Sequence, residues 1–248
     1  MNDQTNVPVS PEPRRPSGIS EWFSTWMTAV TNRSEQTYSR MAEHPDAATP
    51  NRALLWVFLA GTIAALISGV LEAIVTLAGF TSPTAGLSEL FGGAQGGTVF
   101  SLGVSICLSP VAGGVGVLVF AIIVGLIQWI AKRFGGVGTF SQLAYPMAAI
   151  SVPFTIFSSV LTPFSAVPYL GLCTGLVGIL LGIYALLLEI TAVKGVNRFG
   201  WGPAIGSFFF PSVLVLCCAF VPIGVIAAMR LLGPRVGDTF STISNSLP

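Results

Sequence analysis

Five long apolar segments constrain the fold of this chain more than any other feature of its sequence. A helix needs about 20 mainly apolar residues to cross the roughly 30 Å hydrocarbon core of a bilayer. Segments of that kind lie at residues 54–80, 104–131, 143–164, 169–193 and 204–229. The 248 residues carry only 11 basic and 10 acidic side chains, too few to cover a water-soluble domain of this length. The sequence therefore predicts an all-α membrane protein, a five-helix transmembrane bundle.

The remaining residues divide the chain into an N-terminal region, the transmembrane domain and a short tail. Residues 1–18 are polar and hold four prolines, which predicts a disordered segment. Residues 19–53 begin with apolar side chains at helical spacing, and we expect an amphipathic N-terminal helix there. The transmembrane domain is expected at 54–230 and the C-terminal tail at 231–248.

The apolar face of the expected N-terminal helix is rich in aromatic residues. Its membrane-interface residues are Trp22, Phe23, Trp26 and Met27. Trp and Phe on one face are typical of a helix that lies in the interface of a bilayer. A helix packed under the bundle, or bound to a partner, explains the same pattern, and the sequence leaves these interpretations open.

The positions of Lys and Arg between the spans indicate an orientation. Arg52 precedes the first span, Lys132 and Arg133 follow the second, and Lys194 and Arg198 follow the fourth. The loops after the first and third spans contain neither Lys nor Arg. Because short cytoplasmic loops are enriched in these residues, the alternation predicts a cytoplasmic N-terminus and a C-terminus on the outside.

Small residues recur on one face of two spans, as in helices that pack closely against another helix. In the fourth span they are Gly171, Gly175, Gly178 and Gly182, spaced by four, three and four residues. In the first span they are Gly61, Ala65 and Ser68. Besides contact with the lipid bilayer, this pattern predicts association with other transmembrane proteins or with a second copy of the chain.

Two glutamates, Glu72 and Glu189, lie within the spans and continue the small-residue faces. An ionised carboxylate facing lipid is costly, so we expect both on packing surfaces. At a rise of 1.5 Å per residue, Glu72 lies about 27 Å along the first span. Arg230 ends the fifth span at the same level, and we predict an ion pair between Glu72 and Arg230.

Glu189 is expected near the inner edge of the membrane, as is Gln128 in the second span. It could pair with Lys194, Arg198 or Lys132, or form a hydrogen bond with Gln128. The buried polar residues Glu72, Arg230, Glu189 and Gln128 have two interpretations: they fix the register of the helices, or they form a proton or cation site.

The sequence lacks the groups that most enzymes need. His44 is the only histidine and lies outside the spans, no span contains Asp, and no G-x-x-x-x-G-K-[ST] loop is present. The four cysteines match no zinc or redox spacing. A net charge of +1 excludes a polybasic nucleic-acid binder. We therefore expect no enzymatic activity, no catalytic, cofactor or metal site, and no nucleic-acid partner.

Three stretches of the chain resemble the Yip family, named after its Ypt/Rab-interacting domain. They are VTNRSEQTYSRMAEHPDAATPNRALLWVFLAGTIAALISGVL, GGVGTFSQLAYPMAAISVPFTIFSSVL and VPYLGLCTGLVGILLGIYALLLEITAVKGVNRFGWGPAI. The resemblance covers roughly residues 31–230. It implies five spans, a cytoplasmic N-terminus and, for a prokaryotic-type member, an inner or plasma membrane location. The Asp-Leu-Tyr-Gly-Pro motif of eukaryotic members is absent before the first span, so a role in Rab GTPase binding does not transfer.

These observations favour a non-enzymatic integral membrane protein. It would act as a helix-packing scaffold, a membrane-organising protein or an accessory subunit of a membrane complex. The alternative is a small transporter or channel that uses Glu72 and Glu189 inside the membrane. A third hypothesis is a lipid-handling or membrane-shaping protein that acts through the apolar stripe from Trp22 to Val30. A water-filled cavity at either glutamate would favour transport.

Overall fold

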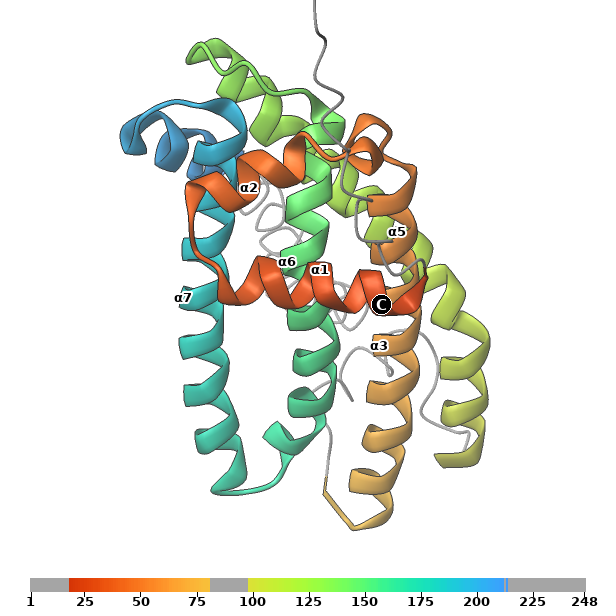
Figure 1. Ribbon diagram of the computed structural model, residues 1–248. Helices are drawn as coiled ribbons and strands as arrows, with labels where there is room; N and C mark the ends of the chain where they lie inside the picture. Colours follow the sequence, from red (N-terminus) through yellow and green to blue (C-terminus); the bar gives the residue numbers. More distant parts are fainter. Residues whose placement is uncertain (1–17, 81–97, 212, 214–248) are drawn as a thin grey trace, which may run out of the picture.

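The structure is a computed structural model that describes residues 18–80, 98–211 and 213, which form helices and turns (Figure 1). Two short helices, α1 (Ile19–Thr31) and α2 (Glu35–Ala42), precede a 3₁₀ turn, η1 (Pro45–Ala48). The long helices are α3 (Asn51–Leu77), α5 (Thr98–Arg133), α6 (Phe140–Leu161) and α7 (Leu170–Asn197). A second 3₁₀ turn, η3 (Thr162–Ala166), follows α6, and residues 201–211 are again helical.

Four helical segments of the described chain are long and apolar enough to cross a membrane. They are Asn51–Leu77, Leu102–Arg133, Phe140–Ala166 and Leu170–Asn197, and they match the first four predicted spans. The fifth predicted span, 204–229, begins within helical residues, but residue 212 and residues 214–229 lie outside the described residues. The all-helical class is therefore confirmed, while the fifth crossing stays a prediction. The segment 1–17, Arg230 and the tail at 231–248 also lie outside the described residues.

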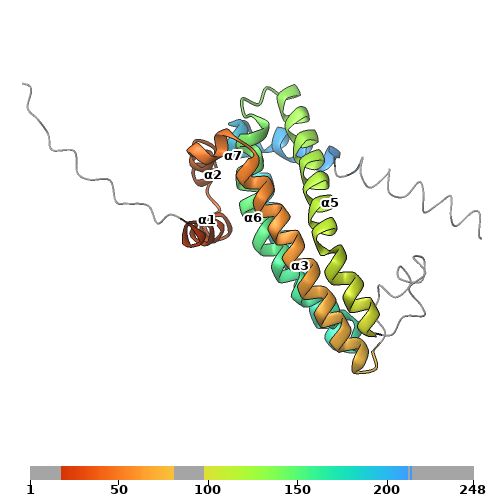
Figure 2. The same cartoon turned by 90° about the vertical axis from the view of Figure 1, so that its right-hand side faces the viewer.

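The four long helices run side by side, and α3 lies between α5 and α6 while α7 packs against α6 (Figure 1 and Figure 2). The start of α3 and the ends of α5 and α7 lie at the same end of the bundle, uppermost in Figure 1. We call it the basic end, because it holds Arg52, Lys132, Arg133, Lys194 and Arg198. The alternation of basic turns seen in the sequence thus corresponds to one end of the fold.

The starts of α2 and α6 have local causes in the sequence. The hydroxyl of Ser34 accepts a hydrogen bond from the backbone N–H of Gln36 and caps α2. At α6 the Thr139 hydroxyl accepts from the Gln142 backbone N–H, while the Gln142 side chain accepts from the Thr139 backbone N–H. This reciprocal capping box satisfies two donors that the helix leaves unpaired, and it starts α6 directly after the glycine-rich loop.

The contact between α3 and α5 depends on glycine. A Cβ atom on Gly61 would lie 3.2 Å from the Cα atom of Gly113, and a Cβ atom on Gly113 would lie 2.8 Å from the carbonyl oxygen of Phe58. Gly61 therefore lies at a helix–helix contact within the chain. The other small residues predicted on this face, Ala65 and Ser68, are half-buried on α3.

The buried core lies toward the basic end. Its largest fully buried side chains include Tyr38 from α2, Trp56 from α3, Ile127 from α5, Leu143 and Ile150 from α6, and Leu188 from α7. Large apolar side chains on the outer faces of the long helices, such as Leu77, Leu172 and Leu176, are exposed. Contiguous exposed apolar surface of this kind suits contact with lipid, since hydrocarbon does not penalise exposed aliphatic groups.

Candidate functional site

The first described helices form a cap on the bundle near its basic end. We define the N-terminal cap as α1, α2 and η1. α1 runs across α6, and α2 packs against α6 and α7 (Figure 1). The Tyr38 hydroxyl of α2 donates to the Ala29 carbonyl at 2.8 Å, and the Tyr184 hydroxyl of α7 donates to the Val30 carbonyl at 2.7 Å. Two phenols thus hold the end of α1, and burial raises the pKa of the Tyr38 phenol above its ordinary value.

The predicted interface residues of α1 lie on two different sides of the helix. Trp22 and Trp26 are partly buried and pack on the core, whereas Phe23 and Met27 are 61% and 46% exposed. Ile19 extends the exposed row with 82% of its surface accessible. The apolar face of α1 is therefore broad enough to contact the bundle and still present a second apolar row outward.

An aromatic cluster joins the N-terminal cap to α3 and α6. Trp56, which is 1% exposed, has ring centroids of Trp22, Trp26 and Tyr145 at 6.1, 5.8 and 5.1 Å. The two Trp–Trp pairs meet edge to face, an arrangement favoured by the ring quadrupoles. Within the described chain, the indole N–H groups of Trp26 and Trp56 are buried without a hydrogen-bond acceptor. Contact with neighbouring aromatic faces compensates only weakly for these missing hydrogen bonds.

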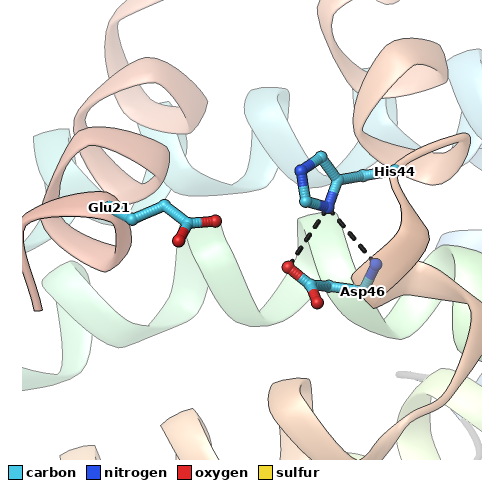
Figure 3. A group of neighbouring side chains, drawn as sticks. All are labelled: Glu21, His44 and Asp46. Carbon is cyan, nitrogen blue, oxygen red and sulfur yellow. Dashed lines mark hydrogen bonds and ion pairs between the residues drawn. The ribbon is translucent and has the colours of Figure 1, made fainter. Parts of the chain in front are cut away.

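Beside the aromatic cluster, Arg52 forms ion pairs with two acids of the N-terminal cap. Its guanidinium pairs with Asp46 of η1 and lies 3.4 Å from a carboxylate oxygen of Glu21 on α1. The Nδ1 atom of His44 lies 3.2 Å from the Asp46 carboxylate and accepts the Asp46 backbone N–H at 3.3 Å (Figure 3). The His44 ring also stacks on Tyr145 at 5.9 Å. These contacts tie α1 and η1 to the start of α3.

Glu21, His44 and Asp46 offer possible metal-ligand atoms within 4.8 Å of one another (Figure 3). The arrangement fits a metal ion poorly, because the Arg52 guanidinium already pairs with both carboxylates and the His44 Nδ1 lone pair accepts a backbone N–H. An ion would have to displace the guanidinium. The cluster is therefore better described as an ion-pair cluster that attaches the N-terminal cap to the bundle.

We expect that Arg52→Gln loosens the N-terminal cap. The exposed fraction of the Arg52 side chain is 22%, and its loss leaves two half-buried carboxylates facing each other, at a cost of about 1–3 kcal/mol. Thermal unfolding in detergent should begin earlier, and tryptophan emission should shift to the red as Trp22 and Trp26 separate from Trp56. Arg133→Gln is the control, because that guanidinium lies over the exposed Trp129 ring at 5.2 Å. Equal effects of both substitutions would contradict the claim that the Arg52 ion pairs attach the N-terminal cap to the bundle.

Two of the basic residues predicted to pair with Glu189, Lys194 and Arg198, contact other residues instead. Lys194 pairs with Glu35 and also lies over the Trp201 ring at 4.4 Å, while Arg198 bonds the Glu43 carboxylate at 2.7 Å. Glu35 begins α2 and Glu43 directly follows it, so the N-terminal cap folds back onto the end of α7. Among the described residues, no ion pair joins Glu189 to Lys194, Arg198 or Lys132.

Gln128 belongs to a buried amide network that involves Asn197, a residue the sequence analysis did not single out. The Gln128 amide donates to the Gly138 carbonyl at 2.6 Å and to the Asn197 side-chain oxygen at 2.9 Å. Asn197 in turn donates to Gln128 at 3.2 Å and accepts the Gly138 backbone N–H at 3.3 Å. The network joins α5, α7 and the loop before α6 at the basic end. The predicted span ended at residue 193, so Asn197 was assigned to the following loop, and only the structure places it in the last turn of α7.

Glu189 lines a large apolar cavity between α3, α5 and α6, with a volume of about 1120 Å³. The polar side chains in its lining are Ser151, Thr155 and Glu189, and the remainder is apolar or glycine. Glu72 does not line it. Counted along the helices at 1.5 Å per residue, Glu72 lies roughly 31 Å from the basic end and Glu189 roughly 12 Å. The structure therefore does not bring the two glutamates together, and the predicted partner Arg230 lies outside the described residues.

The glycine face of α7 differs from that of α3. A Cβ atom on Gly171 would meet the Ser165 carbonyl at 2.6 Å, but one on Gly175, Gly178 or Gly182 would have no described atom of another element within 4 Å. These three glycines form an open stripe, which we call the α7 stripe. Large exposed side chains border it, Ile179 at 63% and Ile183 at 55% among them.

Four apolar helices of spanning length, with a buried core toward the basic end, define a multi-pass integral membrane protein. The chain belongs to the Yip family: the Yip1 domain matches residues 29–222, from the end of α1 through all four described spans. A comparison with curated proteins gave no match, and a comparison with solved structures gave none either. The family resemblance read from the sequence is thereby confirmed.

Proposed function

We propose that this Yip family protein is a non-enzymatic membrane-organising protein that binds other transmembrane helices as a scaffold or accessory subunit. The observation that carries the proposal is the open α7 stripe. In lipid, helices associate mainly by close packing and hydrogen bonds, and glycine allows two backbones to approach. Gly61 and Gly113 illustrate this within the chain. The same kind of surface on α7 faces no described residue.

The proposal includes an orientation in which the basic end is cytoplasmic and the membrane is a prokaryotic inner or plasma membrane. The orientation is supported by the concentration of Lys and Arg at that end. In this orientation α1 lies in the membrane interface, with Ile19, Phe23 and Met27 toward the lipid. The N-terminal cap would then fix the depth of the bundle while α7 contacts its partner, either another transmembrane protein or a second copy of the chain.

Gly175→Ile combined with Gly178→Ile is expected to abolish this association and leave the fold intact. Isoleucine side chains would hold a partner backbone away, while inside the described chain they meet no neighbouring element. The measurement is affinity purification of the full chain from its native membrane in mild detergent, followed by quantification of co-purifying subunits and of the self-associated form. We expect a loss of about tenfold or more.

Gly114→Ile is the matched control, because Gly114 is a glycine of α5 that also has open space around its Cβ position. It should leave the co-purifying subunits unchanged. Two results would contradict the proposal: complexes that persist in the Gly175→Ile, Gly178→Ile variant, or a wild-type protein that purifies alone as a monomer.

A further inference from the structure

An open cavity of about 340 Å³, lined mainly by residues with polar side chains, lies between α1 and α2 of the N-terminal cap, over α6. Its lining residues are Ser24, Thr25, Thr28, Asn32, Thr37, Arg40, Met41, His44 and Tyr145. The lining contains one permanent cation, one imidazole, several hydroxyls and no carboxylate. Its volume falls at the small end of the range of about 300–1,000 Å³ that is usual for ligand pockets.

Three hydrogen-bond donors of this cavity are unused within the described chain. Thr37 and Arg40 lie three residues apart and so share one face of α2, and Asn32 ends α1. The side chains of Asn32, Thr37 and Arg40 make no hydrogen bond or ion pair with a described residue. By contrast, the Ser24 and Thr28 hydroxyls donate to carbonyls of their own helix. The free donors therefore come from two elements and converge on one space.

The floor of the cavity is held rigidly. His44 stacks on Tyr145 with an interplanar angle of 4°, and the Nδ1 atom at the edge of its ring contacts Asp46. Both neighbouring acids, Glu21 and Asp46, are engaged by Arg52. Arg40 itself forms no ion pair within the described chain, which leaves its guanidinium available to an anionic ligand. A planar guanidinium with several N–H groups matches the oxygens of a phosphate particularly well.

The position of the cavity relative to α1 indicates where such an anion comes from. At 100° per residue, Ser24 and Thr28 lie on the side of α1 opposite to Ile19 and Phe23, which are exposed and apolar. A helix with this distribution lies flat at the membrane surface. The apolar row then points into the acyl chains, and the cavity opens at the level of the lipid headgroups.

We infer that this cavity binds a phosphate group, supplied by the headgroup of an anionic phospholipid, with Arg40 as its main anchor and Thr37 and Asn32 as supporting donors. This inference goes beyond the proposed helix association and does not depend on the α7 stripe. Inorganic phosphate carries the same chemistry, so the test separates the two sources. A headgroup held here would attach the N-terminal cap to the membrane surface.

The experiment measures binding of dihexanoyl phosphatidic acid to the full chain in detergent by native mass spectrometry. Dihexanoylglycerol, which lacks the phosphate, gives the background from apolar cavities. Arg40→Gln is expected to weaken phosphatidic acid binding about tenfold or more, since it removes the charge-assisted bonds. Thr37→Val and Asn32→Ala should each weaken it about threefold to tenfold. Arg33→Gln is the matched control. It removes the same positive charge as Arg40→Gln, but Arg33 lines a different cavity.

Inorganic phosphate as competitor decides the source of the ligand. If it does not displace the lipid at similar concentrations, the acyl chains contribute and the ligand is a lipid. If phosphate displaces the lipid equally well and itself binds in an Arg40-dependent manner, the phosphate site stands but the lipid source is wrong. Equal weakening by Arg33→Gln and Arg40→Gln, or binding no stronger than that of dihexanoylglycerol, would overturn the site.

Discussion

Replacing Gly113 by alanine is expected to destabilise the bundle by about 1–3 kcal/mol, the usual cost of overpacking a close contact. The added Cβ would lie 2.8 Å from the Phe58 carbonyl oxygen and against the Thr62 hydroxyl, which itself donates to that carbonyl at 2.9 Å. The hydroxyl can rotate, but a helical carbonyl cannot move without shifting α3. Relief of the clash therefore requires α3 and α5 to separate.

The neighbouring glycine provides the control for this experiment. A Cβ on Gly114 has nothing within 4 Å in the described chain, and alanine has the higher helix propensity by roughly 0.5–1 kcal/mol. Thermal unfolding in detergent should therefore show a lower midpoint for Gly113→Ala and an unchanged or higher one for Gly114→Ala. For a chain of this size about 1 kcal/mol corresponds to roughly 2–4 °C. Equal midpoints would mean that α3 and α5 do not pack at this distance.

The second large effect is expected at Asn197, which is 1% exposed. Asn197→Leu leaves the Gln128 amide short of a partner and the Gly138 backbone N–H without one, each costing about 1–3 kcal/mol in a dry interior. We expect a loss of roughly 3 kcal/mol in chemical or thermal unfolding. The loop before α6 should also become accessible to protease, since Gln128 and Asn197 both form hydrogen bonds with Gly138 of that loop.

A double-mutant cycle separates the network from simple packing. Gln128→Leu together with Asn197→Leu removes both side-chain amides, so the pair no longer leaves an orphaned amide at position 128. The double variant should be more stable than the sum of the two single effects predicts, by about 1–2 kcal/mol. Recovery should stay partial, because the Gly138 N–H and carbonyl remain unpaired. Strict additivity would show that the two amides do not interact.

The sequence was sufficient to predict the four described spans, because hydropathy over 20 residues depends on composition and not on the path of the chain. Helix ends were less well predicted: α3 begins at Asn51, and α7 continues to Asn197, four residues beyond the expected end at 193. Polar residues extend both ends, and the one that ends α7, Asn197, is buried against Gln128. A hydropathy window counts them as loop.

The sequence could not assign partners to the small-residue faces or to Glu189. Gly61 and Gly178 have the same local pattern, yet one contacts α5 and the other meets no described element. That difference depends on the order of the helices in space. Similarly, Lys194 pairs with Glu35 because α2 folds back onto α7, a contact between residues 159 positions apart. The cavity at Arg40 was not predictable for the same reason, since its donors converge only once α1 and α2 are folded.

The central claim, that the α7 stripe binds another protein helix, is tested most directly by photo-crosslinking in the native membrane. An aliphatic diazirine amino acid is placed at Ile179, which borders the stripe, or at Leu180, on the opposite side of α7; their exposed fractions are 63% and 61%. We predict protein adducts from position 179, their loss when Gly178→Ile is added, and lipid adducts alone from position 180. Lipid adducts alone from both positions, or the same protein adducts from both, would contradict the account.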